Sequence, residues 1–179
     1  MQLLPRDPIV FQFDPKEREA WKRGELIDEW FGKYPFLFDS DNWRNAKHAT
    51  YAERAQHEYG YHYAEWYSAI QLYKRYKLLS LVGKYTFPSH RWKWAALHMI
   101  VKRQRDRDVI MSKKRPDLLV YTKNYSQYCL VEVKGPGDRL SDGQIRDFKD
   151  IADTLKVGVH YVHLKACTEV DPEHCVVNP

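Results

Sequence analysis

The strongest constraint on this chain is a pair of short apolar runs in its C-terminal half, each carrying charge at one end. Asp117 opens the run Leu118 to Tyr121, and the run Tyr128 to Val133 contains Glu132 and is followed by Lys134. A short polar stretch separates the runs, so they predict an antiparallel hairpin. Because strand side chains alternate between faces, Glu132 and Lys134 should point the same way. The hairpin therefore predicts two acids and an ammonium at the ends of neighbouring strands.

Two carboxylates gathered in this way repel each other unless a cation neutralises them. Mg²⁺ prefers hard oxygen ligands and keeps several waters, so Asp117, Glu132 and a substrate phosphate suffice to place it. Lys134 would aim its ammonium at the same pocket, where it can orient a water molecule. The pattern thus predicts a magnesium-dependent site for phosphodiester hydrolysis.

Positive charge is concentrated just before this hairpin. Residues 91–115 hold nine Lys and Arg against two Asp, a net of +7, whereas the whole chain carries +5. A basic block is often only a solvated surface, but this one runs directly into the acidic pair, and a polyanionic substrate needs cations to approach carboxylates. We therefore predict nucleic-acid contact by Arg91, Lys93, Lys102, Arg103, Arg105, Arg107, Lys113, Lys114 and Arg115.

Length and composition fit a single globular domain of 179 residues, with 44% hydrophobic residues and no apolar stretch of transmembrane length. No secretory signal is visible at the N-terminus, and three cysteines without framework spacing suit a reducing compartment. These features predict a cytoplasmic protein without membrane association. Cys167, His174 and Cys175 make only a weak zinc pattern. No Gly-Lys-Ser/Thr follows Gly135-Pro136-Gly137, so a nucleotide cofactor is not expected.

Helices and strands are predicted from apolar periodicity and breakers. Helices are expected at about 15–31, across 41–76 with a break at Gly60, at 89–103 with Trp92, Ala95, Ala96 and Met99 facing inward, and after a capping box at Ser141 and Gln144; strands are expected at 77–82, 117–121, 128–133 and 157–164. This order predicts an α/β fold with a small mixed sheet flanked by helices. We expect an N-terminal, mainly helical extension over 1–60, the core over 61–166 with a basic helical insertion at 88–114, and an irregular tail over 167–179.

The segment from Arg115 to Leu164 resembles the VRR-NUC (virus-type replication–repair nuclease) family of the PD-(D/E)XK nuclease superfamily. The resemblance lies in Pro116-Asp117 and in the run Glu132-Val133-Lys134-Gly135-Pro136-Gly137-Asp138-Arg139-Leu140-Ser141, followed by Gln144. It implies a restriction-endonuclease-like core that cuts DNA, often branched or flapped, with Mg²⁺ or with Mn²⁺ as a substitute.

Carried over by position, the resemblance makes Asp117 and Glu132 metal ligands, with the backbone carbonyl of Val133 as a further one. Lys134 would position or activate the hydrolytic water, and Gln144 would belong to the same site, although Gln144 is equally explained as a partner of Ser141 in the capping box. The chain departs from the family at Asp147, where a Trp is usual.

The family also has an acid on its first core helix, outside this firm match. Glu65 is the candidate, because it precedes an apolar helical face that leads directly into the strand at 77–82. Glu58 lies seven residues earlier and is on the same face if the helix continues through Gly60, so it is the alternative.

The resulting hypothesis is a metal-dependent DNA endonuclease acting on branched, flapped or duplex DNA. One rival is a catalytically silent nucleic-acid-binding module of the same fold; a second is an RNA-directed or defence nuclease. A homodimer is expected if two strands are cut symmetrically.

Overall fold

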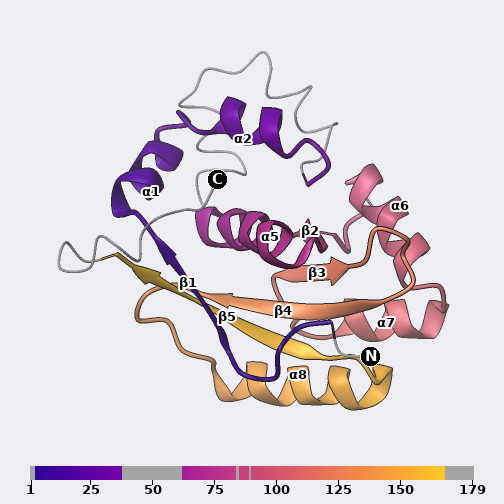
Figure 1. Ribbon diagram of the computed structural model, residues 1–179. Helices are drawn as coiled ribbons and strands as arrows, with labels where there is room; N and C mark the ends of the chain where they lie inside the picture. Colours follow the sequence, from indigo (N-terminus) through magenta and orange to yellow (C-terminus); the bar gives the residue numbers. More distant parts are fainter. Residues whose placement is uncertain (1–2, 38–61, 84, 89, 168–179) are drawn as a thin grey trace.

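The computed structural model describes residues 3–37, 62–83, 85–88 and 90–167. These residues form strands and helices that are interspersed along the chain (Figure 1). The elements are β1 (Ile9–Phe13), α1 (Pro15–Lys22), α2 (Ile27–Lys33), α5 (Tyr63–Tyr76), β2 (Leu79–Val82), α6 (Arg91–Ile100), α7 (Gln104–Ser112), β3 (Leu118–Tyr121), β4 (Tyr128–Lys134), α8 (Asp142–Leu155) and β5 (Val159–Ala166).

The strands form one mixed sheet in the order β1-β5-β4-β3-β2. The β2–β3 and β3–β4 pairs are antiparallel, whereas β4–β5 and β5–β1 are parallel. The parallel β4–β5 pair needs a crossover, and α8 provides it across one face of the sheet (Figure 1). The predicted α/β fold, with a mixed sheet flanked by helices and further helices at the N-terminus, is confirmed.

One face of the sheet is covered by α5, with α1 and α2 outside it (Figure 1). The contact is largely aromatic: the Trp21 and Trp30 ring centroids are 4.5 Å apart, those of Tyr63 and Tyr67 are 5.4 Å apart, and Phe13 meets Tyr63 edge-on. Each such pair adds about 0.5–1.5 kcal/mol beyond its buried area. These rings join the N-terminal helices and β1 to the rest of the fold.

The opposite face packs against α6, α7 and α8. Leu119 and Leu130 from the hairpin meet Leu97, Ile110 and Ile151, one from each helix, and all five are fully buried. Strand alternation therefore supplies two separate apolar layers. Glu132 and Lys134 share the strand parity of Leu130, so they lie on the α8 face.

The N-terminal segment differs from its prediction in two ways. The helix expected at 15–31 is divided into α1 and α2, because Gly24 has φ of +80°, in the left-handed region that ends a helix. In addition, β1 adds an edge strand to the sheet, and its alternating burial was not recognised among the Pro and aromatic residues.

The basic segment also differs from its prediction. Two helices, α6 and α7, replace the single helix expected at 89–103. Ala96 is buried as expected, but Ala95 and Met99 are exposed, and Leu97 and Ile100 face the core instead. The buried face is thus displaced around the helix, since the predicted face began at Trp92, which is only half-buried.

Among the described residues, no helix combines the length and apolarity that a bilayer crossing needs. Cys129 is a buried free thiol in β4, whereas Cys167 is disulfide-bonded. The latter departs from the expectation of reduced cysteines. Of the zinc pattern, His174 and Cys175 lie outside the described residues, as do Glu58 and the helix expected across 41–61.

Candidate active site

The hairpin register sets Asp117 opposite Glu132. Leu118 pairs with Val131 in the antiparallel β3–β4 ladder, so Asp117, one residue before β3, falls across from Glu132. Residues opposite each other in such a ladder place their side chains on the same face, with Cβ atoms about 4.5–5.5 Å apart. The two acids foreseen from the sequence therefore lie together at one end of the sheet.

Glu132 is held in a buried polar cluster with Lys134 and Gln144. Lys134 Nζ lies 2.8 Å from Glu132 Oε1, and the same oxygen accepts a 2.7 Å hydrogen bond from Gln144 Nε2. Glu132 and Lys134 are only 3% and 9% exposed. Buried ions of this kind are tolerated because they are paired and hydrogen-bonded.

Gln144 completes the capping box and also contacts both charged side chains of the cluster. It is the third residue of α8, where its backbone N–H donates to Ser141 Oγ and its Oε1 accepts from the Ser141 backbone N–H, completing the capping box. Its Oε1 also lies 3.4 Å from Lys134 Nζ. The cap thus fixes the Gln144 amide so that its oxygen faces the ammonium and its nitrogen faces Glu132.

Asp117 is half-buried, and its Oδ2 accepts a 2.9 Å hydrogen bond from the backbone N–H of Val133. Burial raises the pKa of Asp117, and the nearby carboxylates of Glu132 and Glu65 raise it further; the Val133 N–H and Lys134 oppose this shift. The two facing acids are therefore electrostatically crowded, which is the condition that a divalent cation relieves.

The candidate ligands are carboxylate oxygens, the type of hard donor that Mg²⁺ prefers. Asp117 Oδ1 and Glu132 Oε2 accept no hydrogen bond from the described residues, so each acid keeps one hard oxygen for a cation. However, no group of three His, Cys, Asp or Glu side chains converges on one point in the described part of the chain. The protein would therefore supply two carboxylates, and the remaining positions would fall to waters, backbone or phosphate.

Glu65, the predicted acid of the first core helix, is in the first turn of α5. It is close enough to influence Asp117, but its Oε1 is paired at 3.0 Å with Nδ1 of His62. Its role as a metal ligand stays a prediction, as does that of the Val133 carbonyl.

Asp147, where the family usually has Trp, has an identifiable contact. Its Oδ2 accepts a 3.3 Å hydrogen bond from the backbone N–H of Lys114, while the neighbouring Phe148 fills the core under α8. Asp150, one turn along, pairs with Lys113 at 3.0 Å. These contacts join α8 to the segment that leads into Asp117.

Lys93 and Arg107 are corrections to the predicted DNA-contacting set. Lys93 is 2% exposed, donates a 2.9 Å hydrogen bond to the Val82 carbonyl and lies over the Trp66 ring. Arg107 is 8% exposed and donates to the carbonyls of Val101 and Lys102. Both cations satisfy backbone acceptors inside the fold, so neither faces a nucleic acid.

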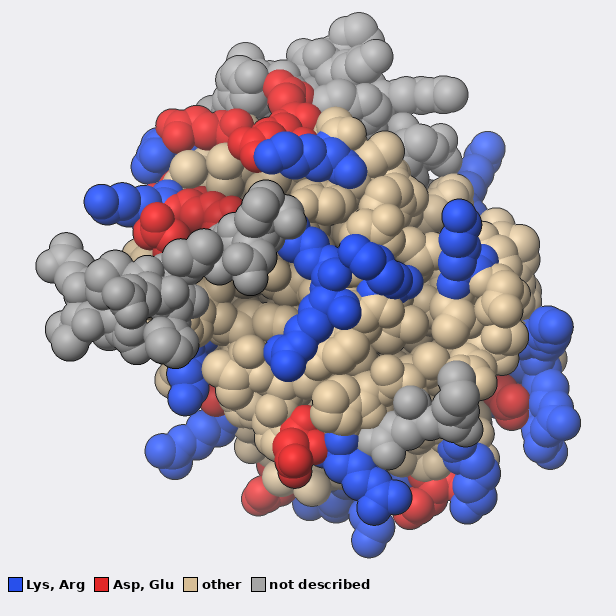
Figure 2. Space-filling view, in the orientation of Figure 1, with Lys and Arg blue, Asp and Glu red and all other residues tan. Residues whose placement is uncertain are grey.

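The other predicted cations are exposed or half-buried and fall into two groups along the chain. Lys113, Lys114 and Arg115 lie two to four residues before Asp117, with Lys114 exposed and the other two half-buried. The exposed Lys102, Arg103 and Arg105 lie at the start of α7, one helix length of about 14 Å before its end at Ser112, and Arg91 begins α6. Figure 2 shows Lys and Arg at the right-hand margin, where α6 and α7 lie in Figure 1.

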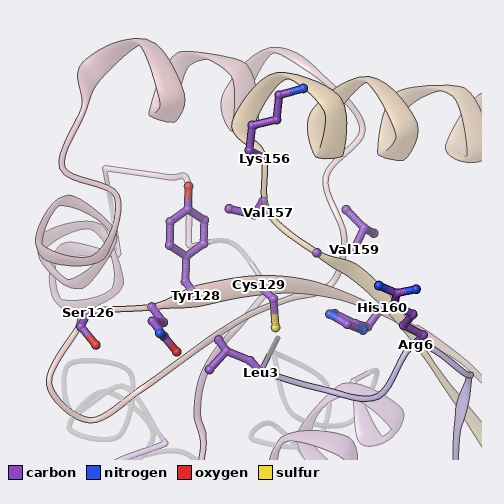
Figure 3. A pocket seen from close by; sticks show the side chains of 11 residues that line it. Leu3, Arg6, Ser126, Tyr128, Cys129, Lys156, Val157, Val159 and His160 are labelled. Carbon is purple, nitrogen blue, oxygen red and sulfur yellow. The ribbon is translucent and has the colours of Figure 1, made fainter. Parts of the chain in front are cut away.

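A cavity of about 550 Å³ lies at the other end of the sheet, so it is not part of this site (Figure 3). Tyr128 and Cys129 at the start of β4, His160 in β5 and Lys156 after α8 line it. His160 Nδ1 lies 2.9 Å from the Pro5 carbonyl oxygen, and burial lowers the pKa of His160. The acids are at the opposite ends of β3 and β4.

Sequence reasoning overlooked Tyr85, which is fully buried beside the site. Its hydroxyl donates a 2.8 Å hydrogen bond to the Pro116 carbonyl. Burial raises the pKa of Tyr85, and the charges of Asp117 and Glu132 add to this shift. No local pattern marks this residue, because its contact depends on how the loop after β2 folds back.

A mixed sheet with an Asp, a Glu and a Lys gathered at one end is the arrangement of a PD-(D/E)XK nuclease domain. Residues 87–165 match the family model described as the VRR-NUC domain, so the resemblance inferred from the sequence is confirmed.

Among solved structures, the chain is similar to the crystal structure of paFAN1 bound to 5′ flap DNA with a gap. The identity is 28% and the TM-score 0.28, and the match covers 42% of this chain and 14% of that one. The chain therefore corresponds to only a small part of that protein's length. No curated protein matches this chain.

Proposed function

We propose that this chain is a metal-dependent endonuclease that hydrolyses phosphodiester bonds in branched or flapped DNA. The observation that carries the proposal is the meeting of Asp117, Glu132 and Lys134 at one end of the sheet, with an unbonded oxygen on each acid. The VRR-NUC family supports a nuclease, and the preference for branched DNA rests on the family resemblance alone.

In this proposal Asp117 and Glu132 hold Mg²⁺, for which Mn²⁺ substitutes, with Glu65 and the Val133 carbonyl as further ligands. When bound, the ion neutralises charge on the scissile phosphate. Lys134 orients the attacking water and offsets developing negative charge, since its ammonium is already held 2.8 Å from Glu132. Gln144 acts as a positioning residue, because its capped amide limits where the Lys134 ammonium can go.

The DNA backbone approaches across the cations that surround the acids. Lys113, Lys114 and Arg115 would contact phosphates next to the scissile bond, because they lie two to four residues before Asp117. The exposed Arg91, Lys102, Arg103 and Arg105 would contact a duplex farther away. The described part of one copy carries one such site, so symmetric cleavage of both strands would require a homodimer.

The decisive experiment is to incubate the purified chain with labelled flap, junction, duplex and RNA substrates, with and without Mg²⁺. We expect cleavage of flapped or junction DNA only when Mg²⁺ is present. Binding of DNA without cleavage at any metal concentration would favour a silent binding module. Preferential cleavage of RNA would favour the RNA-directed alternative.

A further inference from the structure

Phe87 is an exposed aromatic side chain in the loop between β2 and α6. It keeps 46% of its surface exposed, whereas Tyr85, two residues earlier, is fully buried. An isolated exposed apolar residue needs no explanation in itself. The position of Phe87 relative to the acids gives it significance.

Two hydrogen bonds hold the Phe87 loop against the start of β3. The Gly83 backbone N–H donates to the Asp117 carbonyl at 2.9 Å, and the Tyr85 hydroxyl donates to the Pro116 carbonyl at 2.8 Å. After the loop, the His90 N–H donates to the Phe87 carbonyl at 3.0 Å as the chain enters α6. The loop is therefore anchored to the residues that position the Asp117 carboxylate.

Arg115 joins this exposed ring to the strand that carries the acid. Its guanidinium carbon lies 5.0 Å from the centre of the Phe87 ring, a cation–π geometry, and Arg115 is two residues before Asp117. The guanidinium covers one face of the ring, so the exposed surface belongs to the rest of it. Arg115 is half-buried, so part of the residue retains access to solvent.

A ring and a guanidinium held together beside a phosphodiesterase site match the two parts of a nucleotide. Every base has an aromatic face that stacks on a ring regardless of sequence, and a guanidinium pairs with phosphate through a planar fork of donors. A base must be unpaired for its face to become available. Stacked bases in a continuous duplex do not offer one.

We propose that Phe87 and Arg115 form a stacking platform for an unpaired base next to the scissile phosphate, so that Phe87 is a specificity residue for flapped or single-stranded DNA. This inference rests on the proposed nuclease function. It accounts for an aromatic ring left exposed on a loop that is hydrogen-bonded to Pro116 and Asp117.

The test compares Phe87→Leu, which keeps apolar volume but removes the aromatic face, with Phe87→Trp, which retains one. The substrate is a 5′ flap with 2-aminopurine as its first unpaired base, whose fluorescence falls on stacking. We expect Phe87→Leu to raise KM for the flap about tenfold, the scale of one lost stacking contact, and to abolish most of the fluorescence change. Phe87→Trp should restore both.

Phe36→Leu is the matched control. Phe36 is also an exposed phenylalanine, at 36%, but it follows α2 and packs against Tyr34 and Tyr73. The Phe36→Leu substitution should leave KM and the fluorescence change at wild-type values. Thermal unfolding monitored by circular dichroism would show that each variant folds.

Equal KM and equal fluorescence change in Phe87→Leu and wild type would overturn the platform while leaving the nuclease assignment intact. Absence of cleavage by the wild type on every substrate would instead overturn the nuclease assignment. In that case the platform is tested by titrating each protein into the 2-aminopurine flap and following fluorescence. A fluorescence change that is seen with the wild type and lost in Phe87→Leu supports the platform, and an equal change with wild type and Phe87→Leu refutes it.

Discussion

The strand end that carries the acids and the basic segment that precedes it differ in what sets the direction of their side chains. At the strand end, the ladder register brings Asp117 and Glu132 together as the sequence pattern requires. In the basic segment, charge alone identified nine cations, yet Lys93 and Arg107 turn inward. Alternation along a strand determines the face to which each side chain points, whereas the charge of a helical segment does not reveal which of its residues face solvent.

Two buried lysines make the contrast concrete. Lys134 pairs with a carboxylate and an amide at the candidate site, whereas Lys93 donates to a backbone carbonyl and lies over a Trp ring. Both are nearly inaccessible, so burial alone does not distinguish a candidate catalytic lysine from a structural one. The groups around the ammonium distinguish the two lysines. Acids lie near the ammonium of Lys134 at the candidate site, whereas that of Lys93 in α6 meets the backbone carbonyl at the end of β2.

The largest expected effect tests the strand end as a metal site. Chelation with EDTA should abolish cleavage, and Mg²⁺ or Mn²⁺ should restore it, because the two facing acids need a cation to bring in a phosphate. Glu132→Gln should weaken Mg²⁺ binding measured by isothermal titration calorimetry. Cleavage that persists in EDTA after dialysis would remove the basis for assigning Asp117 and Glu132 as ligands.

Lys134→Ala should lower kcat by about 10²–10⁴, the range of a positioned proton-transfer or charge-stabilising group, while DNA binding measured by fluorescence anisotropy remains. Circular dichroism and urea unfolding provide the check on folding, because the variant leaves Glu132 buried without its ammonium partner. Gln144→Ala should have a smaller effect. Wild-type kcat in Lys134→Ala would be incompatible with the proposed role.

Lys93→Met tests the other buried lysine. Losing the hydrogen bond to the Val82 carbonyl should lower the free energy of unfolding by about 1–3 kcal/mol, measured by urea denaturation, with no change in the Kd for DNA. Arg91→Met, an exposed cation on the same helix, is the control and should leave stability within about 0.5 kcal/mol. A loss of DNA affinity in Lys93→Met with unchanged stability would contradict a purely structural role for Lys93.

The smallest effect is expected from one exposed cation near the acids. Lys114→Ala should weaken DNA binding a few-fold and reduce the slope of log K against log salt by about 0.7–0.9, because one phosphate contact is lost. The backbone contact of Lys114 with Asp147 is unaffected by this change. Lys123→Ala, at the hairpin turn on the other end of the sheet, should leave the slope unchanged.

The sequence by itself determined the hairpin, the capped helix α8 and the grouping of Asp117, Glu132 and Lys134. These depend on short-range rules: strand alternation, turn chemistry and a capping box that spans three residues. The register follows from the turn, so residues on adjacent strands can be paired without knowledge of the rest of the chain.

Only the tertiary structure decided which cations are buried, that β1 extends the sheet beside β5, and that the Phe87 loop is tied to the Asp117 strand. Each depends on a contact between segments far apart in the chain. Lys93 is buried because the end of β2 presents an unpaired carbonyl to it, and Phe87 lies near the acids because Tyr85 reaches Pro116. Such contacts leave no periodic trace in the sequence, since they arise from packing of whole elements rather than from local spacing.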